Sequence, residues 1–261
     1  MSTAIFGAIS CYMFEIFSFQ FSYFDFAVLS LVGLLIGMAK TGIQGANMIA
    51  VPMVVIIFGG KNSTGVMLPI LMFADIFGVK YYHQHADWNH LKKLLPLALV
   101  GVCLGTITGN YINDEVFVIF MAVIIFLSLI IMVWREKTKP EIPTSIWFAS
   151  TVGVTGGFTT MVGNLAGSVM AMYLLAMRLP KNQFIGTAAW FFLVINLFKF
   201  PFHVVVWKTI TFESFLLDVL LIPAIAVGAY LGIRITKKIS EKDYRWFIII
   251  MTAVAAVAML L

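Results

Sequence analysis

Long apolar runs with few charges recur along the whole chain, and their length is the property that most restricts its fold. A helix needs about 20 apolar residues to cross a membrane. Only 11% of the 261 residues are charged, against about 25% in soluble domains, so the composition excludes a soluble globular protein and a disordered chain. The pattern predicts an all-α integral membrane protein of ten hydrophobic helical segments. These segments are 24–40, 46–59, 64–82, 92–110, 115–134, 145–160, 165–178, 184–207, 214–235 and 244–261.

Basic residues are distributed unevenly between the two sets of connections. If all ten segments cross the membrane, fourteen of the 17 Lys and Arg residues fall in odd-numbered connections, and Lys61, Lys199 and Lys208 remain for the other side. Because cytoplasmic loops are rich in Lys and Arg, we expect both termini on the non-cytoplasmic side of a cell inner membrane. The same asymmetry explains the net charge of +5 without a nucleic-acid partner.

The two halves of the chain share short motifs at constant offsets. Each half holds five segments, an odd number, so a duplicated half has the opposite orientation in the membrane. Such inverted repeats are typical of secondary transporters, whose substrate site lies near the bilayer midplane between the halves. The Gly-x-x-x-Gly pairs favour close helix contacts within the chain. The matches are Lys61-Asn62 with Lys181-Asn182 and His83 with His203, 120 residues apart, and Gly101-x-x-x-Gly105 with Gly228-x-x-x-Gly232, 127 residues apart.

This organisation divides the chain into four parts. Residues 1–23 form an apolar lead-in whose placement stays open, because Glu15 interrupts its apolar run. Residues 24–134 form the first transmembrane repeat, 135–144 a cytoplasmic linker, and 145–261 the second, inverted repeat.

Two of the segments, 46–59 and 165–178, are unusually short. As helices each would be about 21 Å long, less than the ~30 Å hydrocarbon core of a bilayer. The linkers before them, 40–47 and 159–168, are rich in Gly, Thr, Ser and Asn. Broken or re-entrant half-helices at matching places in two halves indicate a transporter site, so we expect the two linkers to approach each other near the midplane. Ordinary short spans with tight turns remain an open alternative.

Each linker leads into the N-terminus of a half-helix, where free N–H groups and the positive dipole end attract anions. Neutral donors beside such a terminus would hold an anion weakly enough to release it. Helix capping and close packing by the same residue types is the competing interpretation. The candidate substrate-binding residues of the linkers are Lys40, Thr41, Gly42, Gln44, Gly45, Asn47, Thr160, Gly163, Asn164, Gly167 and Ser168.

Three ionisable residues lie within or beside the apolar segments. Lys40 adjoins the first linker, Lys199 lies in the eighth segment, and Asp75 lies deep within the third. A charge at the centre of a membrane helix costs about 2.5–3.5 kcal/mol, so such residues are functional by default. We expect Lys199 to contact substrate, or else to extend toward the membrane interface. Asp75, with Asn196 as its approximate repeat mate, is a candidate for proton coupling or for a buried pair.

Catalytic motifs are not evident in this sequence. It has no nucleophile elbow, metalloprotease motif or Walker phosphate loop, so we expect no enzyme activity. One stretch, His83-x-His85-x-Asp87-x-x-His90, has the content of a metal site, but a solvated loop accounts for it without metal. We therefore expect no metal and no cofactor. A transporter of another small anion or of a metal ion, and a membrane accessory subunit or enzyme, remain the alternatives.

Several features of the sequence occur together in one known family. They are a Gly-containing linker, an apolar helix with Pro52, a Lys-Asn-x-x-x-Gly turn and Gly163-Asn164-x-x-Gly167. With the stretches Gly37–Leu95 and Gly157–His203, they make the chain resemble the TauE/SafE family of sulfite exporters from about residue 28 to 261. The resemblance implies a polytopic inner-membrane exporter of two inverted halves. Its partners would be the lipid bilayer and a small anion such as sulfite, thiosulfate or a sulfonate, with the exact substrate and oligomeric state left open.

Overall fold

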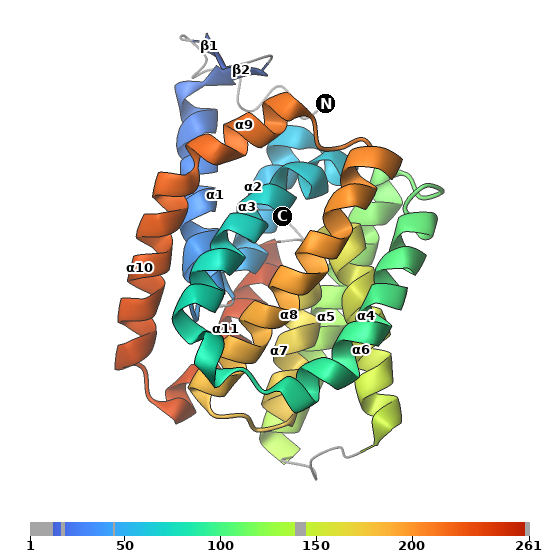
Figure 1. The fold of residues 1–261 in the computed structure, drawn as a ribbon, viewed down its shortest axis with the longest axis vertical. Coiled ribbons are helices and arrows are strands. Elements are labelled where there is room, and N and C mark those ends of the chain that lie inside the picture. Colours follow the sequence, from blue (N-terminus) through green and yellow to red (C-terminus); the bar gives the residue numbers. More distant parts are fainter. Residues whose placement is uncertain (1–12, 17–18, 44, 139–144, 259–261) are drawn as a thin grey trace.

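The chain folds into a bundle of helices with a small β-hairpin at one end (Figure 1). The computed structural model describes residues 13–16, 19–43, 45–138 and 145–258. The strands are β1 (Met13–Ile16) and β2 (Phe19–Ser22). The helices are α1 (Tyr23–Lys40), α2 (Ala46–Phe58), α3 (Gly60–Tyr82), α4 (Trp88–Thr108), α5 (Asp114–Thr138), α6 (Ile146–Gly163), α7 (Ala166–Ala176), α8 (Lys181–Pro201), α9 (Phe212–Leu220), α10 (Ile222–Lys238) and α11 (Glu241–Ala258). A 3-10 turn, His83–His85, follows α3, and a π-helical turn, Phe202–Val206, follows α8.

The hairpin accounts for part of the apolar lead-in. Its two strands pair antiparallel, and Ser22 then caps α1. The Ser22 hydroxyl accepts a hydrogen bond from the Asp25 N–H at 3.1 Å, while the Asp25 carboxylate accepts one from the Ser22 N–H at 3.0 Å. This capping box fixes the start of the first long helix. The rest of the lead-in, residues 1–12 and 17–18, lies outside the described residues.

Within the described chain, four helices are long and apolar enough to cross a membrane, namely α1, α3, α4 and α8. α9 and α10 together would make a fifth, but they are bent by 48° where they meet. The hydrophobic segment predicted over 214–235 is therefore divided into two helices by a bend. Pro223, near the start of α10, has no N–H with which to continue the hydrogen bonding of α9. The ten-segment count, the inverted repeat and the four-part division of the chain stay predictions.

Two breaks in the helices lie where the linkers were expected. The break between α1 and α2 contains Gly42 with a φ of 134°, and the break between α6 and α7 contains Asn164 with a φ of 56°. Gly and Asn adopt such angles at little cost. The helices that follow have only 13 and 11 residues, so each is about 20 Å long or less. Every residue of α7 is buried, which places this half-helix inside the bundle.

Glycines let two pairs of helices approach closely. α1 packs along α10 on one side of the bundle, and α4 packs along α6 on the other (Figure 1). Gly101 of α4 lies against the backbone of Val154 in α6, and Gly228 of α10 lies against the backbone of Leu34 in α1. The close contacts predicted from the Gly-x-x-x-Gly pairs are thus confirmed. Between these two pairs, α3 and α8 contact each other in the centre of the molecule.

Two neighbouring glycines of α6 provide a matched test of this packing. A Cβ on Gly157 would collide with the backbone of Ala98 in α4, whereas a Cβ on Gly156 would lie 3.8 Å from the nearest side-chain atom. We expect Gly157→Ala to destabilise the protein by about 1–3 kcal/mol through overpacking, and Gly156→Ala to be nearly neutral. Thermal unfolding of the purified protein in detergent measures both. Equal unfolding temperatures for the two variants would contradict the α4–α6 contact.

Candidate functional site

A buried ion pair joins the end of α1 to the middle of α3. Lys40 Nζ lies 2.8 Å from Asp75 Oδ1, and the two side chains are only 7% and 0% exposed. Lys40 Nζ also lies 4.0 Å from the centre of the Phe192 ring in α8, which adds a cation–π contact. Because an unpaired buried charge is strongly unfavourable, the pair fixes α1 and α3 relative to each other.

α8 extends this ion pair into a longer network. Asn196 Nδ2 donates to Asp75 Oδ2 at 2.6 Å, and Asn196 Oδ1 lies 3.5 Å from Lys199 Nζ. Lys199 Nζ also donates to Asn164 Oδ1 at 2.6 Å and to Thr160 Oγ1 at 3.2 Å. Lys199 is fully buried, so its amine lies inside the protein. We call the following residues the buried polar network: Lys40, Asp75, Asn196, Lys199, Asn164 and Thr160.

The two linkers contact each other at Asn164. Asn47 Nδ2, at the start of α2, donates to the Asn164 carbonyl at 3.4 Å, and Asn164 Nδ2 donates to the Thr64 carbonyl of α3 at 3.1 Å. The approach of the two linkers that the sequence predicted is therefore present. Their position at the bilayer midplane stays a prediction.

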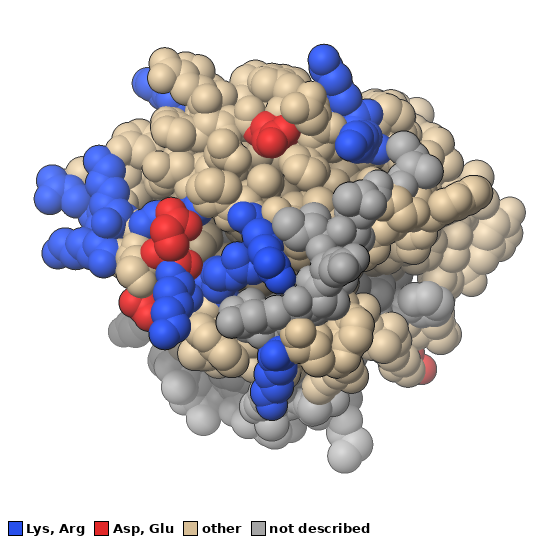
Figure 2. Space-filling view, turned by 90° about the horizontal axis from the view of Figure 1, so that it is seen from below, with Lys and Arg blue, Asp and Glu red and all other residues tan. Residues whose placement is uncertain are grey.

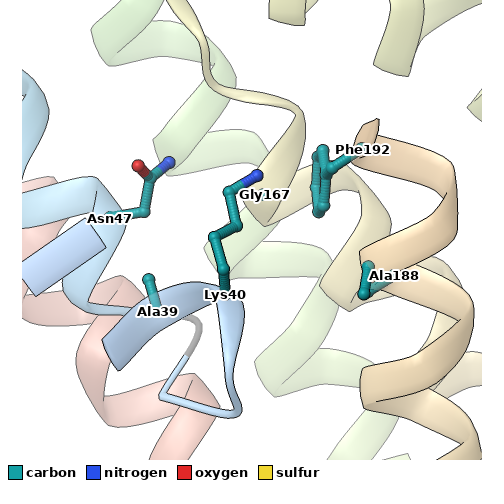
Figure 3. A pocket seen from close by; sticks show the side chains of 7 residues that line it. Ala39, Lys40, Asn47, Gly167, Ala188 and Phe192 are labelled. Carbon is teal, nitrogen blue, oxygen red and sulfur yellow. The ribbon is translucent and has the colours of Figure 1, made fainter. Parts of the chain in front are cut away.

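A small pocket lies beside the buried polar network (Figure 3). In Figure 3 the side chain of Lys40 extends from the end of α1 toward Gly167 at the start of α7, with Asn47 on one side and Phe192 on the other. No side chain among the described residues caps α2 or α7, so backbone N–H groups remain at both N-termini for an anion. The pocket is lined by Ala39, Lys40, Asn47, Gly167, Ala188, Ala189 and Phe192.

The site holds more basic than acidic groups. In the described part of the chain, the buried polar network holds two basic side chains, Lys40 and Lys199, and one acidic side chain, Asp75. The N-termini of α2 and α7 add the positive ends of two helix dipoles. A buried charge without a counter-ion is unfavourable, and an anion in the pocket would neutralise it.

Two predicted binding residues of the first linker belong instead to helix contacts. Thr41 Oγ1 donates to the Ala229 carbonyl at 3.0 Å, which fastens the end of α1 to α10. Gly42 lies against the Thr236 side chain, and its carbonyl accepts a hydrogen bond from Tyr244 at 2.6 Å. These residues hold the linker in place, and they are not among those that line the pocket.

Three more predicted residues have local structural roles. Gly45 lies so close to a methionine of α11 that no Cβ would fit there. Ser168 Oγ donates to the Leu165 carbonyl at 3.1 Å, so its hydroxyl serves the start of α7. Gly163 is the last residue of α6. Gln44 lies outside the described residues.

One face of α8 carries site residues that the sequence analysis missed. Ala188 and Phe192 line the pocket, and Phe192 contacts Lys40. Phe192, Asn196 and Lys199 are spaced by four and then three residues, which places them on one helix face. Extending this spacing back from Asn196 would have identified Phe192 and Ala188 from the sequence.

The histidine-rich stretch has a structural role at the start of α4. Asp87 caps α4, and His90 Nδ1 lies 2.8 Å from the Tyr173 hydroxyl of α7. The two histidines before them are exposed. Among the residues that the structure describes, no three His, Cys, Asp or Glu side chains are grouped so that they could hold a metal ion.

Span-length apolar helices around a buried ionic network are the features of a multi-pass membrane protein. The family profile described as "Sulfite exporter TauE/SafE" matches residues 29–259, so the chain belongs to this family. The family is one of membrane transporters of sulfite or related anions. The family and the transport class predicted from the sequence are thus confirmed. No curated protein matches the chain.

The Lys40–Asp75 pair is open to a stability test. Lys40→Met leaves a buried carboxylate without its closest cation, and removal of one partner of a buried pair typically costs about 3–5 kcal/mol. We expect Lys40→Met to lower the unfolding temperature in detergent, and the double variant Lys40→Met/Asp75→Leu to recover much of the loss. A double variant less stable than either single variant would show that the two charges are not coupled.

Proposed function

We propose that this protein exports a small sulfur-containing anion, such as sulfite, thiosulfate or an organosulfonate, and binds it in the pocket between α1, α2, α7 and α8. One observation carries the proposal. Among the described residues, two buried lysines and a single buried aspartate belong to one hydrogen-bonded network beside two helix N-termini without side-chain caps. An oxyanion is the ligand that satisfies both the charge and the N–H groups.

The residues of the site take different roles in this proposal. Lys40 Nζ and the N–H groups at Gly167 contact the anion, and Asn47 orients it from the other side of the pocket. Lys199, held by Asn164 at 2.6 Å, raises the positive potential of the site. A single direct cation with neutral donors binds loosely enough to permit release, which transport requires.

The helix contacts support a proposed architecture of two inverted repeats. In this scheme α1 to α5 correspond to α6, α7, α8, α9–α10 and α11. If each helix is replaced by its counterpart in the other half, the α1–α10 contact becomes the α6–α4 contact, and the α2–α11 contact becomes the α7–α5 contact. The α3–α8 contact is unchanged, and all of these contacts are present in the structure.

Two lysine contacts follow the same exchange. Lys61 Nζ donates to the Gly109 carbonyl after α4 at 2.9 Å, and Lys181 Nζ donates to the Thr236 carbonyl of α10 at 3.0 Å. The two lysines are 120 residues apart and the two carbonyls 127 apart, the same offsets that relate the sequence motifs. Each lysine thus binds the C-terminal end of the fourth helix of its own half.

Basic side chains gather at one end of the bundle, which supports a proposed orientation. Figure 2 shows this end, seen from below. By the positive-inside rule this end would face the cytoplasm. The proposal keeps the sequence-based prediction that both termini lie on the other side of a cell inner membrane. The exposed basic residues of these helix ends and connections are Lys80, Lys92, Lys93, Lys137, Arg178, Arg234, Lys237, Lys238 and Lys242.

The membrane potential favours export of an anion. With a negative cell interior, each negative charge that leaves gains about 2.3 kcal/mol per 100 mV, so a dianion gains roughly 4.6 kcal/mol. At about 1.4 kcal/mol per decade, the gain for a dianion exceeds three decades of concentration. Export then needs no coupling ion, whereas uptake would need one. Asp75, bound to Asn196, is the candidate proton carrier for uptake.

Proteoliposomes that contain only this protein test the proposal. We expect counterflow of labelled sulfite above that of protein-free vesicles. Lys199→Gln should weaken the apparent affinity for sulfite by about tenfold, near 1.4 kcal/mol, because it removes a buried positive charge near the pocket. The exposed Lys93→Gln is the matched control and should match the wild type. Counterflow of simple carboxylates but not of sulfite would contradict the proposed substrate. The absence of counterflow for every anion would favour an accessory subunit.

Asp75→Asn distinguishes uncoupled export from proton-coupled uptake. Under uncoupled export, potential-driven sulfite efflux per folded protein should stay largely intact, because position 75 carries no proton in the cycle and the asparagine amide oxygen can still accept a hydrogen bond from Lys40 Nζ. Under proton symport, uphill uptake should be lost while counterflow survives. Both fluxes can be measured in one vesicle preparation and corrected for the inserted, folded fraction. Our proposal expects the first result, and a collapse of efflux and counterflow together would contradict it.

A further inference from the structure

The turns that follow α3 and α8 occupy equivalent places in the proposed repeats but have different conformations. The first is the 3-10 turn, which leaves His83 exposed. The second is the π-helical turn, which buries His203 completely. α3 and α8 run in opposite directions, so the two turns lie at opposite ends of the bundle (Figure 1). Because His83 and His203 are 120 residues apart, one repeat position is exposed at the basic end and buried at the hairpin end.

A short segment, residues 207–209, closes over His203, and we call it the plug. The rings of His203 and Trp207 have their centres 5.0 Å apart, and His203 Nδ1 lies 2.9 Å from Thr209 Oγ1. Trp207 Nε1 donates to the Thr106 carbonyl, near the end of α4, at 3.1 Å. The plug therefore belongs to the second half of the chain but is anchored on the first.

Two glycines of the first half make room for the plug. A Cβ on Gly109, which follows α4, would collide with the Trp207 ring. A Cβ on Gly65, near the start of α3, would collide with Thr209. The plug thus fills the space between the end of α4 and the start of α3, and it closes the bundle there.

The backbone of the plug is in conformations that need support from their surroundings. The Trp207 N–H donates to the Phe202 carbonyl, five residues back, at 2.9 Å, and such single π-helical turns are frequent at functional sites. Lys208 has a φ of 54°, which is costly for a residue with a long side chain. Strained residues of this kind persist only while neighbouring contacts hold them. Release of Trp207 from α4 would therefore allow the turn to change.

One buried face of α8 connects the plug with the buried polar network. Asn196, Lys199 and His203 are spaced by three and then four residues, so they share a helix face, and none is more than 1% exposed. Asn196 and Lys199 belong to the network, and His203 is the next position toward the hairpin end. The plug therefore lies between the network and that end of the bundle.

We propose that the plug is the gate through which the anion leaves, and that this structure has the gate closed. The inference rests on the proposed function, in particular on its two inverted repeats, and adds the moving part. In such transporters one repeat moves against the other, and the two sides open in alternation. In the opposite state, the turn after α8 exposes His203 as the turn after α3 exposes His83 here, and the turn after α3 becomes covered.

Hydrogen exchange of the full chain in lipid vesicles, without substrate, tests the gate. In the wild type, we expect the amides of 202–210 to be more protected than those of 82–90. Trp207→Ala removes the ring that holds the plug, so exchange at 202–210 should become faster. Exchange at 82–90, at the other end, should become slower by about twofold or more, as a shift to equal populations of the two states requires. Trp147→Ala, at a position that is 78% exposed, is the matched control and should change neither.

The response of the distant turn distinguishes a gate from a structural contact. Faster exchange at 202–210 alone, no change at either turn, or equal protection of the two turns in the wild type would overturn the inference. If Trp207→Ala does not fold, Gly109→Ala displaces the same ring from the other side and should give the same opposed changes. Opposed changes in a protein without sulfite counterflow would overturn the proposed substrate and leave the gate in place.

Discussion

The contact between Lys40 and Asp75 determines the geometry of the whole site. Because neither charge is stable alone in a dry interior, α1 must end beside the middle of α3, and the chain leaves the helix directly after Lys40 to start α2. Asn196 binds the second oxygen of the same carboxylate, which aligns α8 with this point. α8 in turn brings Lys199 to the break between α6 and α7. This one charge pair therefore fixes the positions of the two helix breaks relative to each other.

The first linker both supports the site and lines it. Thr41 and Gly42 bond to α10 and α11 through the Ala229 carbonyl and the Tyr244 hydroxyl. Lys40, on the other side of the linker, faces the pocket. The bonds to α10 and α11 immobilise the backbone that carries the Lys40 side chain, so the ammonium group is already in place before a ligand arrives. Such preorganisation reduces the entropy lost on binding.

The sequence predicted the elements of this site better than their pairing. Apolar run length and small-residue linkers located both helix breaks, and the rarity of charge within the runs selected Lys40, Asp75 and Lys199. The partner of each charged residue depends on how helices far apart in the sequence pack together. No local sequence pattern predicts that packing. Thr41 was predicted to bind the anion, but its hydroxyl donates a hydrogen bond to a helix carbonyl instead. The bend between α9 and α10 was a missed local signal, since Pro223 stands in the printed sequence.

The complete burial of α7 has a consequence for the surroundings of the anion. All eleven residues of this half-helix contact protein, so its N-terminus never meets lipid. Membranes of different thickness exert their force on lipid-facing helices, which respond by tilting. α7 is shielded from that force by its neighbours. The first turn of α7 is therefore surrounded by protein and not by lipid, in whichever bilayer the bundle resides.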